Sequence, residues 1–252
     1  IKPPTNIVSV SEDINNLFRK ETLRLKVLLL IRDDVLSTCR DPNLSKTIRD
    51  SAINLSWRIA DQPFSSDLLR LVNKRFAIAA GVDKTLSLIW DDLFPCPIEY
   101  VLDNIIYRPR DILQFFIEAQ KEFIPEKPFT YEKLQTVLFN YSCEYFVDAM
   151  KDELTGFFCD DAVSSLPTVL SKMGEQYFYM SDFEEECKKY PAFDAVNIRN
   201  MLSKLFNDGY IGQHRPRASK DYTVFSYRNP LEKFVDNHEC ILHRGLLRAL
   251  TI

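Results

Sequence analysis

The sequence IIYRPRDILQFFIEA, residues 105–119, marks the start of a helix. Pro109 fixes its own φ and restricts Arg108 to extended backbone, so a helix is predicted to begin at this point. Asp111 stands in the first turn, and apolar residues recur at helical spacing through the next two turns. Two arginines, Arg108 and Arg110, are therefore predicted to lie at a helix entrance.

This pair of arginines is a candidate anion clamp. A guanidinium group stays charged at physiological pH, and its planar fork suits phosphate oxygens or carboxylates. The alternative is that each arginine only pairs with a surface acid, as charged residues at helix starts commonly do. The residues alone leave both interpretations open.

Composition sets the broad class of the protein. The 252 residues carry a net charge of −4, so no global basic field attracts nucleic acid or anionic membrane. The longest apolar run, Val27–Ile31, is too short to cross a bilayer, and no signal peptide precedes it, so we expect a cytoplasmic protein with no membrane contact. Six scattered cysteines favour buried thiols in a reducing compartment over a disulfide framework.

Several catalytic motifs are missing from the sequence. Neither G-x-x-x-x-G-K-[ST], G-x-G-x-x-G nor G-x-S-x-G occurs, so no phosphate loop or serine-hydrolase elbow is predicted. His238 and His243 are five residues apart, which places them on different faces of a helix, whereas shared metal ligation needs a spacing of four. The sequence therefore predicts no metal site.

Residues 1–63 are predicted to be the end of an α/β domain. Leu25–Ile31 is an apolar run of strand length, typical of a strand buried on both faces, and 52–57 alternates as a second strand. Two strands cannot make a stable sheet, so the earlier strands are expected upstream. Arg32 follows the first strand, where open α/β sheets bind ligands; alternatively it pairs locally beside a helix capped by Asp33.

The rest of the chain is predicted to be mostly helical, which makes the fold class α+β. Residues 64–173 have helical periodicity throughout and form a predicted helical lid domain. Residues 174–230 form a predicted winged-helix domain. The elements expected are a short strand at 177–179, helices at 182–189 and 194–207, and strands at 210–212 and 222–227, in the order typical of a winged helix. Residues 231–252 are expected to form a closing C-terminal helix.

The loop at 213–220 is the one strongly basic part of the predicted winged helix. Arg215, Arg217 and Lys220 provide three fixed positive charges with no acid among them. Such a tip could contact a phosphate backbone or an acidic protein, although loops also collect charge for solubility. The helix at 194–207 is too neutral for an independent DNA reader.

Taken in order, these parts resemble the C-terminal portion of a prokaryotic P-loop ATPase of the STAND/KAP neighbourhood, several of which act in anti-phage defence. The resemblance rests on IRDD at 31–34, on D-x-N-x-x-K-x-x-RD at 41–50, on YRPRD at 107–111 and on the winged helix with its H-x-G-L tail. It implies that Arg32 senses the γ-phosphate, that Arg108 and Arg110 are lid arginines, and that Arg49 is a weaker candidate for an arginine finger.

The resemblance also implies cofactors and partners. ATP and Mg²⁺ would be bound by the intact protein, through an upstream ATPase core that carries the phosphate loop. The partners implied are that core, a homo-oligomer or a defence effector, and nucleic acid through the wing loop. Because the phosphate loop and its lysine are absent from these residues, this part of the protein alone is not expected to hydrolyse ATP.

Three functions therefore remain open at this point. The first is a nucleotide-responsive lid and winged-helix unit of a P-loop NTPase, which couples ATP binding to conformational change. The second is a winged-helix regulator that binds or senses DNA. The third is a protein-interaction module in a defence or toxin complex.

Overall fold

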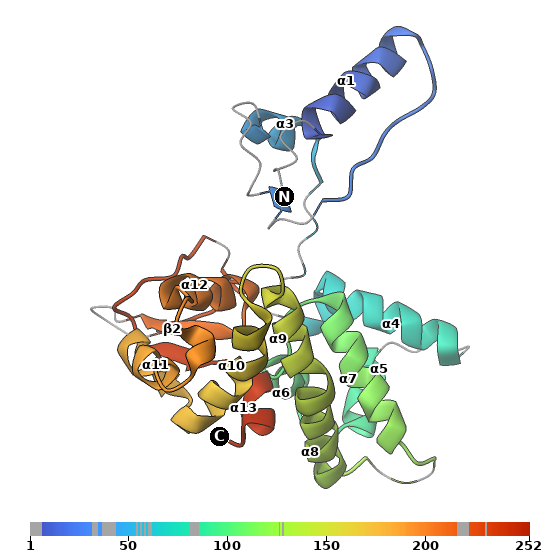
Figure 1. The fold of residues 1–252 in the computed structure, drawn as a ribbon. Coiled ribbons are helices and arrows are strands. Elements are labelled where there is room, and N and C mark those ends of the chain that lie inside the picture. The colour runs from blue at the N-terminus through green and yellow to red at the C-terminus, as the bar shows by residue number, and fades with distance from the viewer. Residues whose placement is uncertain are drawn as a thin grey trace. The chain divides into compact units, whose positions relative to one another are not determined.

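The computed structural model describes most of the chain as two compact units, Ile1–Ser56 and Trp57–Ile252 (Figure 1). The described residues are 7–31, 35–36, 44–53, 55, 57, 59, 62–80, 86–125, 127, 129–215, 222–229 and 231–252. The division between the units falls seven residues before the predicted boundary at 63/64.

The first unit contains helices α1 (Ile7–Lys20) and α3 (Leu44–Ser51), joined by a hydrogen bond of 3.0 Å from the Thr47 hydroxyl to Glu12. The strands predicted here are wrong for the residues that the structure describes. Residues 25–31 form no strand, and neither do the described residues of 52–57. The physical reason is that a strand needs neighbours for its backbone groups, and none is present within the described part of this unit.

The second unit begins with a helical part, as predicted for 64–173 (Figure 1). Its elements are η1 (Pro63–Ser65), α4 (Asp67–Ala80), α5 (Leu86–Leu93), α6 (Ile98–Leu102), α7 (Pro109–Glu122), α8 (Tyr131–Asn140), the π-helical turn η2 (Tyr141–Phe146), α9 (Val147–Leu154) and α10 (Asp160–Met173). The helix start at Pro109 is confirmed, because Arg108 is extended with φ −119° and ψ 142°. Thr130 caps α8, as expected, by accepting a hydrogen bond from the Lys133 backbone N–H.

Aromatic side chains fill the core of this helical part. Trp90 stacks on Phe94 with ring centroids 4.3 Å apart, and Phe94 meets Phe116 edge-on at 6.1 Å. Phe115 is fully buried, and the indole N–H of Trp90 donates to the Cys96 carbonyl. Because buried rings contribute large apolar areas and prefer such edge-on and offset contacts, this cluster fixes α5 against α7.

A four-stranded antiparallel sheet follows the helical part. Its elements are β1 (Tyr177–Phe178), α11 (Met180–Cys187), η3 (Pro191–Phe193), α12 (Ile198–Asp208), β2 (Ile211–Arg215), β3 (Tyr222–Val224) and β4 (Cys240–Leu242), with α13 (Arg244–Leu250) at the end. The strand order is β1-β4-β2-β3, and the register pairs Phe178 with Cys240 and Gln213 with Val224. β2 and β3 form a hairpin, as predicted, but it pairs Gln213–Arg215 with Tyr222–Val224, whereas the strand predicted at 210–212 pairs with β4 instead.

Several local predictions in this region need correction. The helix expected at 182–189 is α11, Met180–Cys187, and the strand expected at 222–227 ends at Val224. The helix expected from 194 begins at Ile198, because η3 occupies 191–193 and Asn197 caps the helix by accepting from the Asn200 N–H. The loop expected from 213 begins later, because β2 continues to Arg215. The tail is not helical throughout, because β4 inserts between β1 and β2 before α13 starts. The fold is thus mostly helical α+β, whereas the winged helix and the P-loop core remnant stay predictions.

The tail docks on the π-helical turn through one serine and one glycine. The Ser142 hydroxyl donates to the Gly245 carbonyl at 2.6 Å and accepts from the Ala249 N–H at 3.0 Å. A Cβ atom at position 245 would lie 2.6 Å from the Asn104 carbonyl oxygen and 2.9 Å from the Phe146 ring. Glycine is therefore required at 245 for α13 to approach the helical part this closely.

We expect Gly245→Ala to lower the free energy of unfolding by about 2–3 kcal/mol, because a methyl group there must push against backbone and a buried ring. Gly156→Ala is the matched control. Gly156 has a φ of +83° but open space around it, so its cost is expected to be about 1 kcal/mol, from backbone strain alone. Urea unfolding followed by circular dichroism measures both. Equal losses in the two variants would contradict the close docking of α13.

Candidate functional site

Arg108 connects the entrance of α7 to two other helices. Its Nη1 lies 3.1 Å from Oε1 of Glu153, near the end of α9, and its Nη2 donates to the Asp208 carbonyl at the end of α12 over 2.9 Å. The guanidinium carbon also lies 5.9 Å from the centre of the Tyr210 ring. The side chain of Arg108 is only 29% exposed and that of Glu153 13%, so this pair is largely shielded from water.

Arg110 faces a short chain of hydrogen bonds on the same side of α7. Its Nε donates to the Tyr145 hydroxyl at 2.9 Å, and that hydroxyl donates to Oδ1 of Asp111 at 2.5 Å. Arg110 itself is exposed, and its two Nη groups make no hydrogen bond to another described residue. Tyr145 thus holds the guanidinium group of Arg110 through its Nε, while the two Nη groups remain open to solvent.

Burial dominates the electrostatics of this cluster. It raises the pKa of Asp111 to about 6, although the Tyr145 hydroxyl and the charges of Arg108 and Arg110 act in the opposite direction. Burial likewise raises the pKa of Tyr210 and of Tyr141. Oδ2 of Asp111 and the Tyr141 hydroxyl are buried, and neither has a hydrogen-bond partner among the described residues. The site therefore holds a carboxyl group that gains a proton more easily than usual.

The structure brings Arg108 and Arg110 to one cluster but gives them different surroundings. Arg108 has its guanidinium occupied by Glu153 and the Asp208 carbonyl, whereas Arg110 keeps its Nη groups available. Whether the pair binds an anion stays a prediction. Sequence reasoning missed Glu153 and Tyr145, because an acid near a helix end and a tyrosine in an apolar stripe give no signal of a contact 45 or 35 residues away.

Two of the other predicted site residues have partners within their own units. Arg49 is 78% exposed and lies 3.4 Å from Asp50. Arg215 donates to the Lys233 carbonyl and lies 3.5 Å from Glu232, with only 14% of its side chain exposed. Arg32, Arg217 and Lys220 lie outside the described residues.

The cations of α12, the helix in the predicted recognition position, are both paired with acids. Arg199 bonds Asp236 at 2.9 Å, and Lys204 lies 2.7 Å from Asp208. These pairs leave little free positive charge on the helix for a phosphate backbone.

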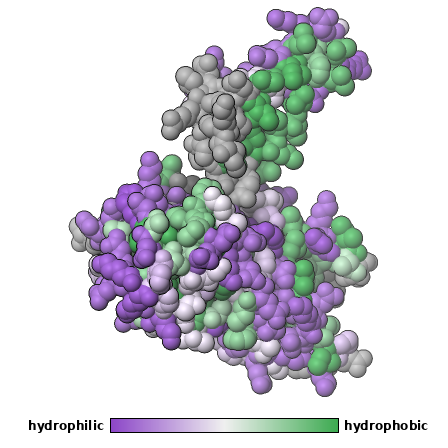
Figure 2. Space-filling model, viewed as in Figure 1, coloured by the Kyte–Doolittle hydropathy of each residue, from purple (hydrophilic) through white to green (hydrophobic). Residues whose placement is uncertain are grey.

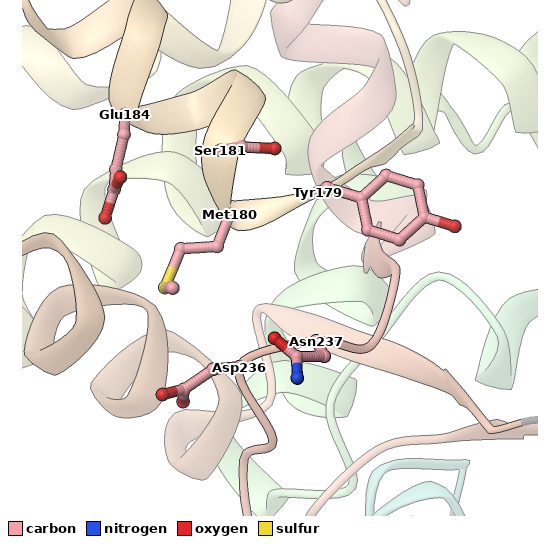
Figure 3. Close-up of a pocket in the computed structure, with 6 residues that line it drawn as sticks. All are labelled: Tyr179, Met180, Ser181, Glu184, Asp236 and Asn237. Carbon is pink, nitrogen blue, oxygen red and sulfur yellow. The ribbon is translucent and has the colours of Figure 1, made fainter.

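A shallow pocket of about 280 Å³ lies where α11 begins (Figure 3). Its walls are Tyr179, Met180, Ser181, Glu184, Asp236 and Asn237. Figure 3 shows the side chains of Met180, Glu184 and Asp236 reaching into the same space from α11 and from the loop before β4. Its volume is just below the range of roughly 300–1,000 Å³ typical of ligand pockets, and its two carboxylates do not suit an anion.

The two tail histidines have separate roles. His243 is fully buried, accepts from the Gly245 N–H at 3.0 Å and lies 3.0 Å from the Tyr227 hydroxyl, and burial lowers its pKa to about 3. His238 lies in the loop before β4, where burial lowers its pKa as well. Among the described residues, no group of three histidine, cysteine or carboxylate side chains is placed to bind a metal ion. None of the helices in that part of the chain is long and apolar enough to cross a bilayer.

A protein family matches part of the chain. Residues 66–149 match the family described as the FunZ-associated C-terminal helical domain. This stretch runs from the residue before α4 into α9, and so includes Arg108, Arg110, Asp111 and Tyr145. No curated protein and no solved structure matches the chain. The family description agrees with the prediction of a C-terminal portion of a larger protein, and it does not bear on the predicted P-loop ATPase.

We expect Arg108→Ala to cost about 2–4 kcal/mol of stability, because it removes the shielded guanidinium that bonds the Glu153 carboxylate and the Asp208 carbonyl. Arg70→Ala is the control. Arg70 pairs with Asp67 at 3.0 Å, but both side chains are about two-thirds exposed, so its loss should cost under about 0.5 kcal/mol. Urea midpoints measure both, and similar midpoints would show that Arg108 does not hold the helices together.

We expect Asp111 to make the free energy of unfolding depend on pH with the opposite sign to a carboxylate in an ordinary ion pair. Because its folded pKa is about 6 and its unfolded value is near 3.8, the folded state binds the proton more tightly. The stabilisation is complete below pH 4 and is lost as the pH rises towards 6 and above. Asp111→Asn removes this penalty, so the variant should gain about 1–3 kcal/mol relative to the parent between pH 4 and pH 7.5. A pH-independent difference in unfolding free energy would contradict this assignment.

Proposed function

We propose that this chain is the non-catalytic C-terminal portion of a larger P-loop NTPase, and that Trp57–Ile252 couples nucleotide binding to a change in conformation. The observation that carries the proposal is the arrangement around α7. Arg110 offers its Nη groups to solvent at the helix entrance, while Arg108, two residues before it, is bonded to the ends of α9 and α12.

The entrance of α7 suits a negatively charged group. Its first-turn N–H groups carry the positive end of the helix dipole, and Arg110 adds a fixed charge beside them. Asp111 is the acid that would oppose such a ligand, and because burial raises its pKa to about 6, a nearby anion could favour its protonation. In this proposal Arg110 contacts a phosphate group, and Arg108 is a positioning residue.

Arg108 also supplies the mechanical link. An anion that binds Arg110 would move the first turn of α7. Arg108, the residue immediately before that helix, is bonded to Glu153 and to the Asp208 carbonyl. Tyr210 follows Gly209 directly after α12 and begins the approach to β2. A shift at the α7 entrance would thus reach α12 and the sheet through one side chain.

The DNA-binding alternative has less support from the geometry. A duplex reader needs unpaired cations on the element that meets the phosphates. Arg199, Lys204 and Arg215 are each bonded to an acid or to a backbone carbonyl within the same unit. The described residues therefore favour an internal, structural use of these charges.

Nucleotide affinity tests the proposal. In the longer polypeptide that contains these residues together with its upstream sequence, Arg110→Gln should weaken binding of a fluorescent ATP analogue about tenfold, the value expected for losing a charge-assisted hydrogen bond. The control Arg70→Gln, at an exposed pair on α4, should leave affinity unchanged. Residues 1–252 alone should show no binding. Equal affinities of the Arg110 variant and the parent, or a longer polypeptide that binds no nucleotide, would refute the proposal.

A further inference from the structure

Asp111 is a buried acid next to an exposed cation at the α7 entrance. The residue is only 2% exposed, whereas Arg110, immediately before it, is exposed. Figure 2 shows that hydrophilic residues predominate on the viewed surface of Trp57–Ile252, so an exposed arginine is ordinary there. Arg110 differs from other surface cations because hydrogen bonds connect it to a buried carboxyl group.

One hydroxyl group makes this connection. The Tyr145 hydroxyl accepts from Nε of Arg110 at 2.9 Å and donates to Oδ1 of Asp111 at 2.5 Å. A hydroxyl group that accepts from a cation becomes a better donor, so the charge of Arg110 strengthens the hydrogen bond to the ionised carboxylate. The ionised form of Asp111 therefore depends on Arg110.

The second oxygen of Asp111 is free to take a proton. Oδ2 is buried and has no hydrogen-bond partner among the described residues, and the same holds for the Tyr141 hydroxyl. The rings of Tyr141 and Tyr145 are 5.3 Å apart, and the charge of Asp111 adds to the rise that burial causes in the pKa of Tyr141. These two groups without partners thus belong to one cluster. A proton on Oδ2 would make it a donor, and a tyrosine oxygen can accept.

The charges around Asp111 act in both directions. Burial raises its pKa, and Glu153 on α9 adds to the rise. The Tyr145 hydroxyl and the charges of Arg108 and Arg110 lower it. Because Arg108 is already bonded to the ends of α9 and α12, Arg110 is the arginine of this pair that can take a new partner without breaking contacts between helices. The titratable and charged groups of the cluster are Arg108 and Arg110 on α7, Tyr141 and Tyr145 on η2, Glu153 on α9, Lys204 and Asp208 on α12, and Tyr210 after it.

We propose that an anion binds to Arg110 together with one proton, which Asp111 takes up from solvent on Oδ2. The anion attracts the guanidinium charge, so the carboxylate loses part of the field that keeps it ionised and becomes a neutral carboxylic acid. No covalent bond of the anion forms or breaks. The inference deepens the proposed function, on which it rests for the anion at Arg110.

The coupling acts in both directions, because the proton and the anion each favour the state that binds the other. Without an anion, Asp111 gains its proton as the pH falls through about 6. The anion therefore binds more tightly below that pH and more weakly above it, where the ionised carboxylate opposes it. A rise of one unit in the pKa of Asp111 corresponds to about a tenfold difference in anion affinity between its two protonation states.

Carbon NMR of the Asp111 carboxyl group tests the inference on the 252-residue chain. The probe is sulfate, because a phosphate group itself titrates near neutral pH. It is used at roughly 10–100 mM, the range expected for weak binding by one exposed arginine. The pKa of Asp111 should rise by about one unit, compared with chloride at the same ionic strength. The carboxyl signal of Glu118, which is also buried on α7 but is bonded to Lys121, is the internal control and should not respond.

Two variants distinguish the coupling from a general salt effect. In Arg110→Gln the pKa of Asp111 should start higher, because a charge that lowers it is gone, and sulfate should no longer change it. Asp111→Asn should bind sulfate with an affinity that no longer depends on pH, measured from the Nε signal of Arg110. An Asp111 pKa that sulfate leaves unchanged, or that rises equally in Arg110→Gln, would overturn the inference. A chain that binds no sulfate would overturn it as well.

These results can be separated from the fate of the proposed function. Proton uptake with sulfate, in a protein whose longer polypeptide binds no nucleotide, would support the coupling and refute the NTPase. Nucleotide binding that depends on Arg110, together with an Asp111 carboxyl group that sulfate does not affect, would do the reverse.

Discussion

The contact of Arg108 with Glu153 and with the Asp208 carbonyl is the constraint on which the second unit depends. A guanidinium group that is mostly withdrawn from water must keep its hydrogen bonds, because an unpaired charge in that position costs several kcal/mol. Arg108 therefore fixes where α9 ends and where α12 ends relative to the start of α7. Pro109 contributes to this arrangement, since it restricts Arg108 to extended backbone at the start of α7.

The end of the chain reinforces that constraint from the other side. Arg248 donates to Oδ1 of Asn104 at 2.6 Å and to Gln135 at 3.1 Å, so α13 is tied to α8 and to the residues after α6. Arg244 and Arg228 share the two carboxylate oxygens of Asp103. These contacts join residues more than 100 positions apart, and they explain why a short helix at the end of the chain forms at all.

The helical part was predictable because helices are encoded locally. Pro109, Thr130 and Gly209 act within one turn of their own positions, so the helix starts at 109 and 131 and the stop at 208 follow from adjacent residues. The strands depended on distant partners instead. Cys240–Leu242 is three residues long and lies in an apolar tail whose pattern also fits a helix, so nothing local distinguishes it as the strand between β1 and β2. Leu25–Ile31 differs in the opposite way. Its apolar pattern indicates a strand, but the described part of its unit contains no neighbouring strand for it to pair with.

The candidate site shows the same division between local and distant information. The position of Arg108 and Arg110 at a helix entrance follows from Pro109, whereas their different fates depend on Glu153 and Tyr145, which lie elsewhere in the sequence. This difference gives the pair its asymmetry. The guanidinium group of Arg108 is already bonded within the fold, whereas Arg110 keeps free donors. In the proposed function, an anion at the entrance of α7 would therefore bind Arg110, two residues from the Arg108 contact that joins the helices. A ligand of modest affinity would then need no deep pocket to influence the fold, because its point of action is already at the junction of α7, α9 and α12.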